Sequence, residues 1–224
     1  MLATVRDLTI GRLEGKGYKA RIRSWRDELW DRRLGISTFG RRDGVGKEND
    51  DHFQGHYEAA HYRDLFLMFE HIGLAKDDVF IDLGCGLARS MFVAARMGVK
   101  QAIGVEIDQG LVDVARLNIA RSGFSPDRVQ VVCAGAEQYI NHNVTVLYLF
   151  NSFGRTTLRL VLENLVDSLK KNPRQFKFIY YNPLQEHLLA ETGTFRRLEY
   201  WPMNTPQDKS HCRYNLSFWE STIN

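Results

Sequence analysis

Short apolar runs alternate with helix-like stretches along the chain from residue 79 onward. Near-continuous apolar runs are typical of strands in a parallel sheet that helices cover on both faces. We expect strands at residues 79–83, 101–107, 129–133, 144–150 and 176–181, and helices at 90–97, 111–121 and 156–171. The pattern therefore predicts an α/β fold built on a doubly wound, mostly parallel sheet.

The last part of the chain departs from this alternation. Residues 195–201 and 214–219 have the pattern of two strands without a helix between them. We therefore expect an antiparallel pair at the C-terminal edge, which brings the predicted sheet to seven strands.

Two helices are predicted ahead of the sheet. Ile22, Trp25 and Leu29 recur at steps of three and four within residues 18–34, as in an amphipathic helix. Residues 58–73 form a second, strongly apolar helix. The sheet therefore carries an N-terminal helical extension, whose tryptophan face we expect to pack on the body as a lid.

The stretch between these helices loses periodicity. Residues 35–52 collect glycines among charges, which predicts a flexible loop. We place a domain boundary after residue 54: residues 1–54 are a helical arm and loop on the lid or acceptor side, and 55–224 are one α/β domain. The first fifty residues carry 12 Lys and Arg against 8 Asp and Glu. Because these charges are interleaved, a solvated helix face is favoured over a nucleic-acid surface.

The composition is that of an ordinary globular protein. The chain has 224 residues, of which 44% are hydrophobic, and a formal net charge of +3, which argues against disorder. Its longest apolar run is far shorter than the about 20 residues that a membrane-spanning helix needs, and we expect no secretory leader. The three cysteines are far apart and match neither a disulfide framework nor a zinc pattern. We expect a cytoplasmic protein without a metal or a membrane partner.

The most informative stretch is VFIDLGCGLARS at residues 79–90. A strand runs into a glycine-bearing turn and then into a helix, which is where open parallel sheets bind their ligands. Gly84 and Gly86 allow the backbone to approach a ligand closely, since they lack a Cβ. Glu106 follows Gly86 by twenty residues and ends the second strand, at the spacing where a carboxylate reaches ribose hydroxyls.

Two cofactors fit this outline, and charge decides between them. A dinucleotide needs a third glycine and places its pyrophosphate on the helix N-terminus, but Arg89 occupies the third glycine position. Asp82 lies two residues before Gly84, where a carboxylate repels a pyrophosphate. S-adenosylmethionine carries a sulfonium and an ammonium and no phosphate, so we expect it as the cofactor.

The runs FIDLGCGLARS, GVEID, CAGAEQY and YLFNSFG resemble, in this order, the class I S-adenosylmethionine-dependent methyltransferases over residues 55–224. The segments HYEAAHY and YYNP extend the resemblance to small bacterial methyltransferases of unassigned acceptor. The resemblance implies that Asp82 serves the methionine amine and that Glu106 binds the ribose hydroxyls. The cofactor-binding residues that it implies are Asp82, Gly84, Cys85, Gly86, Glu106, Ile107, Gly135, Ala136 and Asn151.

Two residues depart from the family pattern. Ala136 stands where the adenine-reading loop of the family often has an Asp, so Glu137 is an open substitute for that role. Ala88 replaces a third glycine, and one extra methyl group is expected to tighten the turn slightly.

On the acceptor side, the end of the fourth strand is similar to the Asn-Pro-Pro-Tyr/Phe motif of amino methyltransferases, without its prolines. An Asn carbonyl there orients an attacking amine, and an aromatic ring walls in the acceptor. Asn151, Phe153 and Tyr57 are the predicted catalytic residues, with Tyr57 near the methionyl end by resemblance. Asn151 is equally compatible with a turn-capping role, and Phe153 with a place in the core.

The predicted function is methyl transfer to a nitrogen, or less favourably an oxygen, of a small molecule or a protein side chain. Nucleic acid is not expected as an acceptor. An amine requires no strong general base, and His56, His61 and Glu137 are the only candidates for one. Two alternatives stay open: an NAD(P)-dependent oxidoreductase and a non-catalytic module that binds S-adenosylmethionine.

Overall fold

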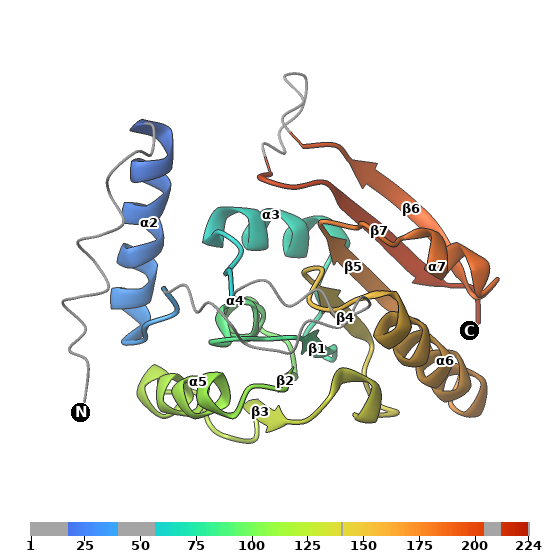
Figure 1. Cartoon of the computed structure of the whole chain (residues 1–224). Helices are drawn as coiled ribbons and strands as arrows, with labels where there is room; N and C mark the ends of the chain where they lie inside the picture. The colour runs from blue at the N-terminus through green and yellow to red at the C-terminus, as the bar shows by residue number, and fades with distance from the viewer. Residues whose placement is uncertain (1–17, 40–56, 140, 204–211, 224) are drawn as a thin grey trace.

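In the computed structural model, residues 18–39, 57–139, 141–203 and 212–223 are described. They form one sheet in the order β3-β2-β1-β4-β5-β7-β6 (Figure 1). Its strands are β1 (Val79–Leu83), β2 (Gln101–Glu106), β3 (Val129–Cys133), β4 (Val146–Leu149), β5 (Lys177–Tyr181), β6 (Phe195–Trp201) and β7 (Leu216–Ser221). Strand β7 runs antiparallel to both of its neighbours, and β1 to β5 pair in parallel.

Helices cover both faces of the sheet (Figure 1). The helices α3 (Tyr62–Ile72), α4 (Arg89–Met97) and α5 (Gln109–Ser122) pack on one face, around Phe80 and Tyr148. The helices α6 (Arg155–Lys171) and α7 (His187–Glu191) pack on the other face, around Ile81 and Leu147. Because alternate strand residues point to opposite faces, β1 is buried along its whole length, as the apolar runs predict.

The predicted seven-stranded, doubly wound fold and its antiparallel C-terminal strands are confirmed. The second N-terminal helix begins at Tyr62 rather than at residue 58, because the preceding His61 has extended backbone angles. Gly73 ends this helix in the left-handed conformation. Two short elements were not predicted: α7 and the 3-10 helix η1 (Ala136–Gln138), which are too short for a periodic apolar pattern.

The topology places the site. The strand order reverses between β1 and β4, since the chain leaves β1 toward β2 and β3 and then returns to the other side of β1. In open α/β sheets, ligands bind at the carboxyl ends of the strands beside such a switch point. The turn after β1 and the turn after β4 therefore face each other across the expected ligand crevice.

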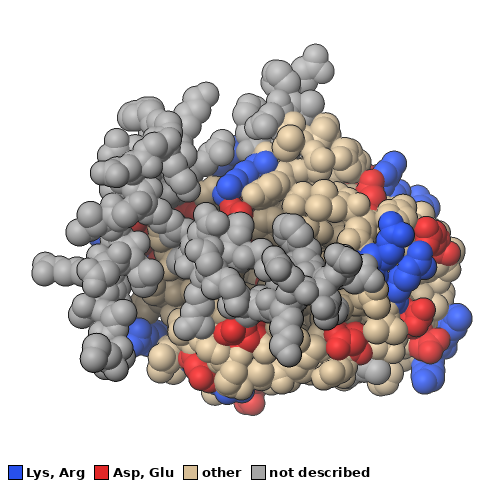
Figure 2. Space-filling view, viewed as in Figure 1, with Lys and Arg blue, Asp and Glu red and all other residues tan. Residues whose placement is uncertain are grey.

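The N-terminal helix α2 (Tyr18–Leu34) has the predicted bounds. Its predicted packing face is only partly correct, because Trp30 packs on the core but Trp25 is 59% exposed. The predicted boundary at residue 54 and most of the 35–52 loop lie outside the described residues, so the division into two parts stays a prediction. Within the described ranges, no helix has the length and apolarity to cross a bilayer. Figure 2 shows basic and acidic residues interspersed near α6 and the β6–β7 pair, where Arg159 contacts Glu191 and Arg197 contacts Glu186.

Candidate functional site

The turn after β1 is built around two glycines with positive φ. Gly84 has φ +85° and Gly86 has φ +52°, a region that L side chains rarely adopt. A Cβ on Gly84 would overlap the side chain of Ser152, and a Cβ on Gly86 would overlap the ring of Tyr57. Because the two glycines lack a Cβ, Ser152 and Tyr57 can both pack directly against the turn after β1.

The N–H groups of this turn point into the protein. The N–H groups of Gly84 and Cys85 both donate to the Val105 carbonyl, at 2.8 and 3.1 Å. The Gly86 N–H donates to Glu106 Oε2 at 3.0 Å. A pyrophosphate site needs such N–H groups directed at the ligand. The N–H groups of Gly84, Cys85 and Gly86 are therefore already paired and are not directed at a ligand.

Asp82 leaves one carboxylate oxygen without a partner. Its Oδ2 accepts a hydrogen bond from the Ser90 hydroxyl, whereas Oδ1 is buried and has no hydrogen-bond partner among the described residues. Burial raises the pKa of Asp82 to about 7, the Ser90 bond opposes this, and the charge of Glu106 adds to it. An unpaired buried carboxylate oxygen is costly, so this position favours a cationic partner such as an ammonium group.

Glu106 holds the end of β2 to the glycine turn. Its Oε1 accepts hydrogen bonds from the backbone N–H groups of Ile107 and Asp108, at 2.8 and 3.0 Å, while Oε2 accepts from Gly86. These bonds fix the carboxylate in one orientation and leave a lone pair of Oε2 for a ligand hydroxyl. Ile107 is 60% exposed and offers an apolar surface beside it, which suits the predicted cofactor contact.

The other predicted cofactor residues lie around the same edge. The Cys85 side chain is buried against Gly104 and Met91, so only its backbone can face a ligand. Gly135 precedes η1, and a Cβ on it would press on the Glu137 carboxylate. Ala136 and Glu137 therefore stand at the rim after β3, and their adenine-reading role stays a prediction.

Asn151 follows β4 in a left-handed conformation, with φ +41°. Its side chain is 8% exposed, and its Oδ1 accepts one long hydrogen bond, 3.5 Å from the Tyr180 hydroxyl. The neighbouring Ser152 side chain packs against Gly84. The structure thus brings Asn151 to the glycine turn, where its side chain makes this one long hydrogen bond among the described residues.

Phe153 is placed differently. Its ring is buried in the cluster under α6, on the face of the sheet away from Asp82, which is the core alternative. Phe150 lies nearer the predicted acceptor side, with its ring centroid 4.7 Å from that of Tyr181 and 5.4 Å from that of Tyr214. The sequence pattern did not single out these aromatic residues, because they come from three strands or strand ends far apart in the chain.

Tyr57 lies against Gly86, as the resemblance implies for the methionyl side of the turn. Its hydroxyl donates to the Thr38 carbonyl at 2.9 Å. Of the two candidate histidines, His61 contacts Asp27 through Nδ1 at 2.7 Å, and His56 lies outside the described residues. The ring of Tyr57 therefore covers the turn, whereas His61 is bonded to Asp27.

A buried polar network, missed at the sequence level, connects α2 to this turn. Arg89, only 4% exposed, donates to Thr38 Oγ1 at 2.7 Å and to Asp27 Oδ2 at 3.0 Å. Asp31 accepts from the Thr38 hydroxyl and from the Tyr62 hydroxyl, at 2.7 and 2.6 Å. In the sequence, this network could have been recognised from Asp27 and Asp31, which lie one helical turn apart on α2, and from Arg89 at the start of α4.

The described residues contain no cluster of His, Cys, Asp and Glu that could hold a metal ion. Within that part of the chain, the site thus consists of a glycine turn, two buried carboxylates, an unused amide and aromatic side chains. Such a set can bind a cation and orient a nucleophile, and it contains no Ser-His-Asp type arrangement.

The sequence is similar to known methyltransferases. Residues 54–123 match the family model described as histone methylation protein DOT1. A protein-lysine N-methyltransferase of Saccharolobus islandicus (strain REY15A) is 33% identical over 138 residues, which cover 59% of this chain and 83% of the relative.

Solved structures with the same fold are also enzymes of this kind. The M1A22 tRNA methyltransferase of B. subtilis aligns with a TM-score of 0.57 at 15% identity, over 74% of this chain and 68% of that one. An RNA methyltransferase from Salinibacter ruber, solved with S-adenosyl-L-homocysteine, aligns with a TM-score of 0.53 at 18% identity, over 73% of this chain and 93% of that one. Both neighbours are named as RNA enzymes, which contradicts our expectation that nucleic acid is an unlikely partner.

Proposed function

Because the chain belongs to the class I S-adenosylmethionine-dependent methyltransferases, we propose that it methylates a nitrogen atom, with a protein lysine side chain as the favoured acceptor. Its family, its fold and its cofactor, S-adenosylmethionine, are as predicted from the sequence. The oxidoreductase alternative is thereby set aside.

One observation carries the cofactor assignment at the level of residues. The glycine turn directs its N–H groups inward, while Asp82 Oδ1 beside it is buried and unpaired within the described part of the chain. A phosphate would meet a carboxylate there, beside N–H groups of Gly84, Cys85 and Gly86 that are already paired. An ammonium or a sulfonium would instead relieve the buried negative charge.

The residues present fit this cofactor. Asp82 would hold its ammonium, Glu106 its ribose hydroxyls, and Tyr57 would cover the turn. When bound, S-adenosylmethionine supplies a methyl group whose bond to the sulfonium sulfur breaks as the acceptor nitrogen forms its own. The Asn151 carbonyl would accept a hydrogen bond from the acceptor N–H and so direct the nitrogen lone pair at the methyl carbon.

The acceptor side favours an amine on a long side chain. Phe150, Tyr181 and Tyr214 form an aromatic wall beside Asn151, and aromatic faces attract ammonium groups. Glu58, which is ion-paired with Arg213, accepts a hydrogen bond from the Tyr214 hydroxyl at 3.1 Å at the edge of this wall. The similarity to a protein-lysine N-methyltransferase, 33% identical over 138 residues, supports a lysine acceptor.

A nitrogen of an RNA base is the second candidate. The tRNA and RNA methyltransferases among the structures with this fold support it. The two acceptors can be distinguished by enzymatic digestion, since a nuclease degrades a methylated RNA and a protease degrades a methylated protein.

Labelled transfer tests the proposal. The full chain is incubated with methyl-labelled S-adenosylmethionine and a cell extract that has been treated with nuclease or with protease. We expect label that survives the nuclease, disappears with the protease and is recovered as methyllysine after hydrolysis, with no label from Asp82→Asn. Label that disappears only with the nuclease would replace lysine by RNA, and bound S-adenosylhomocysteine without any label would favour the non-catalytic alternative.

A further inference from the structure

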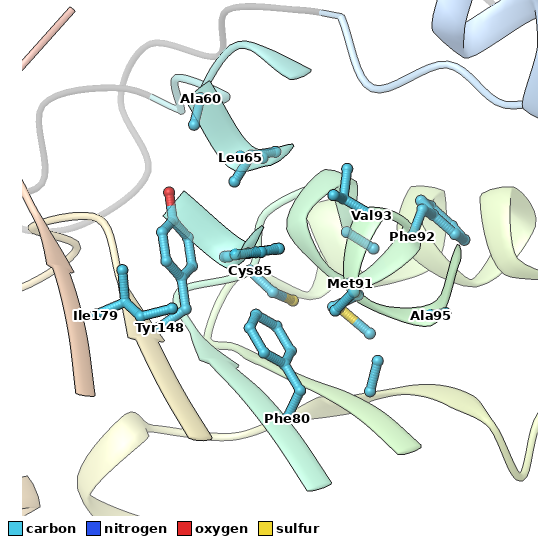
Figure 3. Packing of buried hydrophobic residues seen from close by; sticks show 14 of the residues in the cluster. Ala60, Leu65, Phe80, Cys85, Met91, Phe92, Val93, Ala95, Tyr148 and Ile179 are labelled. Carbon is cyan, nitrogen blue, oxygen red and sulfur yellow. The ribbon is translucent and has the colours of Figure 1, made fainter. Parts of the chain in front are cut away.

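Tyr148 carries a second buried polar atom that lacks a partner. It lies in the middle of β4, its residue is 2% exposed, and its hydroxyl has no hydrogen-bond partner among the described residues. Figure 3 shows the hydroxyl pointing away from Phe80, toward the segment that carries Ala60 and Leu65. A buried hydroxyl without a hydrogen-bond partner destabilises the fold, so a ligand that pairs with it would explain its presence.

Packing does not require this hydroxyl. The Tyr148 ring lies 5.7 Å from the Phe69 ring and 6.3 Å from the Phe80 ring, centroid to centroid. A phenylalanine would make the same ring contacts without burying an oxygen. The contacts of the described residues therefore give the hydroxyl no structural role in the core.

The position of the Tyr148 hydroxyl beside Asp82 suggests a function for it. Tyr148 and Asp82 are paired residues on the adjacent strands β4 and β1. Strand residues in register point to the same face, about 5 Å apart, so the two side chains are neighbours. Burial raises the pKa of Tyr148 well above its usual value, and the largest further contribution is the charge of Asp82. The phenol therefore stays protonated, and it lies within the field of the carboxylate that also has an unpaired oxygen.

We propose that the Tyr148 hydroxyl is an additional cofactor-binding group, which holds the ammonium of the methionyl moiety together with Asp82. An ammonium has three N–H donors, enough to reach Asp82 Oδ1 and the Tyr148 oxygen at once. One group thereby satisfies both unpaired atoms. This inference rests on the cofactor of the function proposed above and does not depend on the identity of the methyl acceptor.

Binding measurements test it without any turnover. The dissociation constants of S-adenosylhomocysteine and of methylthioadenosine, which lacks the amino-acid part, are measured by calorimetry for the full chain and for Tyr148→Phe. We expect Tyr148→Phe to weaken S-adenosylhomocysteine about 5- to 30-fold and to leave methylthioadenosine within about twofold. A deaminated S-adenosylhomocysteine, with a keto oxygen in place of the amine, should bind both proteins equally.

Tyr181→Phe is the matched control. Tyr181 is a buried tyrosine on the same face of the neighbouring strand β5, but its hydroxyl donates to Asp64 at 2.8 Å. This variant should lose folding stability and keep its affinity for S-adenosylhomocysteine. Circular dichroism and the unfolding midpoint show whether each variant is folded; should Tyr148→Phe fail to fold, the wild-type preference for S-adenosylhomocysteine over its deaminated analogue decides.

The outcomes separate this inference from the proposed function. Equal affinity of wild type and Tyr148→Phe for S-adenosylhomocysteine would overturn the role of Tyr148 and leave the methyltransferase intact. An equal loss for S-adenosylhomocysteine and methylthioadenosine would mean that the hydroxyl only supports the fold. Failure of the wild type to bind S-adenosylhomocysteine would overturn the proposed function itself.

Discussion

At the scale of single residues, the site is defined by atoms whose bonding is incomplete. Asp82 Oδ1 and the Tyr148 hydroxyl lack partners within the described residues, and Asn151 Oδ1 has one long bond. Buried polar groups are normally satisfied, so such atoms mark where a ligand belongs. This level of detail is not accessible from the motif DLGCG alone, which identifies the turn but not the bonding of each oxygen.

The raised pKa of Asp82 predicts how stability depends on pH. Between about pH 4 and 7 the folded ligand-free protein binds one more proton than the unfolded chain, so its stability falls as pH rises through this window. Asp82→Asn removes this dependence. Relative to the variant, the wild type should lose about 2–4 kcal/mol of unfolding free energy from pH 4 to pH 8.

Urea denaturation at several pH values, in the absence of cofactor, checks this. Saturating S-adenosylhomocysteine should restore the stability of the wild type at pH 8 and have a much smaller effect on Asp82→Asn. Parallel stability profiles for the two proteins would show that Asp82 titrates normally and is not held unpaired.

Asn151 is predicted to act on the acceptor rather than on the cofactor. Asn151→Gly keeps the left-handed backbone at φ +41°, which Asn151→Ala would strain. We expect the glycine variant to bind S-adenosylhomocysteine with unchanged affinity and to lose about 10- to 100-fold in kcat, because the amine is no longer oriented.

Calorimetry and a label-transfer assay measure these two quantities separately. Asn182→Gly controls for the effect of a glycine on folding, since Asn182 has φ +57° after the neighbouring strand β5. An unchanged kcat in Asn151→Gly would assign Asn151 to the turn alone.

At the scale of elements, the main finding is how α2 is attached. Arg89 sits in the first turn of α4, directly after the glycine turn, and pairs with Asp27 of α2. It also donates to the Thr38 carbonyl at 3.3 Å, the same oxygen that receives the Tyr57 hydroxyl. Docking of α2 and placement of the Tyr57 ring on Gly86 thus share one set of hydrogen bonds.

Removal of the arginine head group should therefore affect folding and binding together. Arg89→Met removes the guanidinium that Asp27 and Asp31 both face and leaves Asp27 with His61 and the Tyr62 N–H as its partners, which costs about 3–5 kcal/mol of unfolding free energy. It should also weaken S-adenosylhomocysteine, because Tyr57 loses its support. The double variant Arg89→Met/Asp27→Leu should recover part of the stability, since the buried Asp27 charge is removed together with its cation.

Urea denaturation of the two variants provides the comparison. Arg32, an exposed arginine of α2, is the control position, and Arg32→Met should change the unfolding free energy by less than about 0.5 kcal/mol. If Arg89→Met were as stable as the wild type, the network would not anchor α2.

The element scale also shows what a sequence pattern can predict. The strands β1 and β3 have the predicted bounds: β1 is a short apolar run buried on both faces, and β3, at the edge of the sheet, is a short run of mostly apolar residues with one buried face. The glycine turn was predictable because its backbone requires residues without a Cβ. The Arg89 network and the aromatic wall at Phe150 were not, since each joins side chains from segments more than twenty residues apart.

At the scale of the whole molecule, the sheet topology gathers these parts. The carboxyl ends of β1, β2 and β4 bring Asp82, Glu106 and Asn151 to one edge, at the point where the strand order reverses. The family is shared with a protein-lysine N-methyltransferase, and the fold with an RNA methyltransferase. The family accounts for the cofactor, and we propose that the residues around Asn151 select the acceptor.

The most direct test of this account is a crystal structure of the full chain with S-adenosylhomocysteine. We predict an adenosyl group above the Gly84–Gly86 turn, ribose hydroxyls on Glu106, and the methionyl ammonium between Asp82 and Tyr148. Density for the ligand elsewhere, or a dinucleotide that binds with its pyrophosphate against this turn, would contradict the assignment.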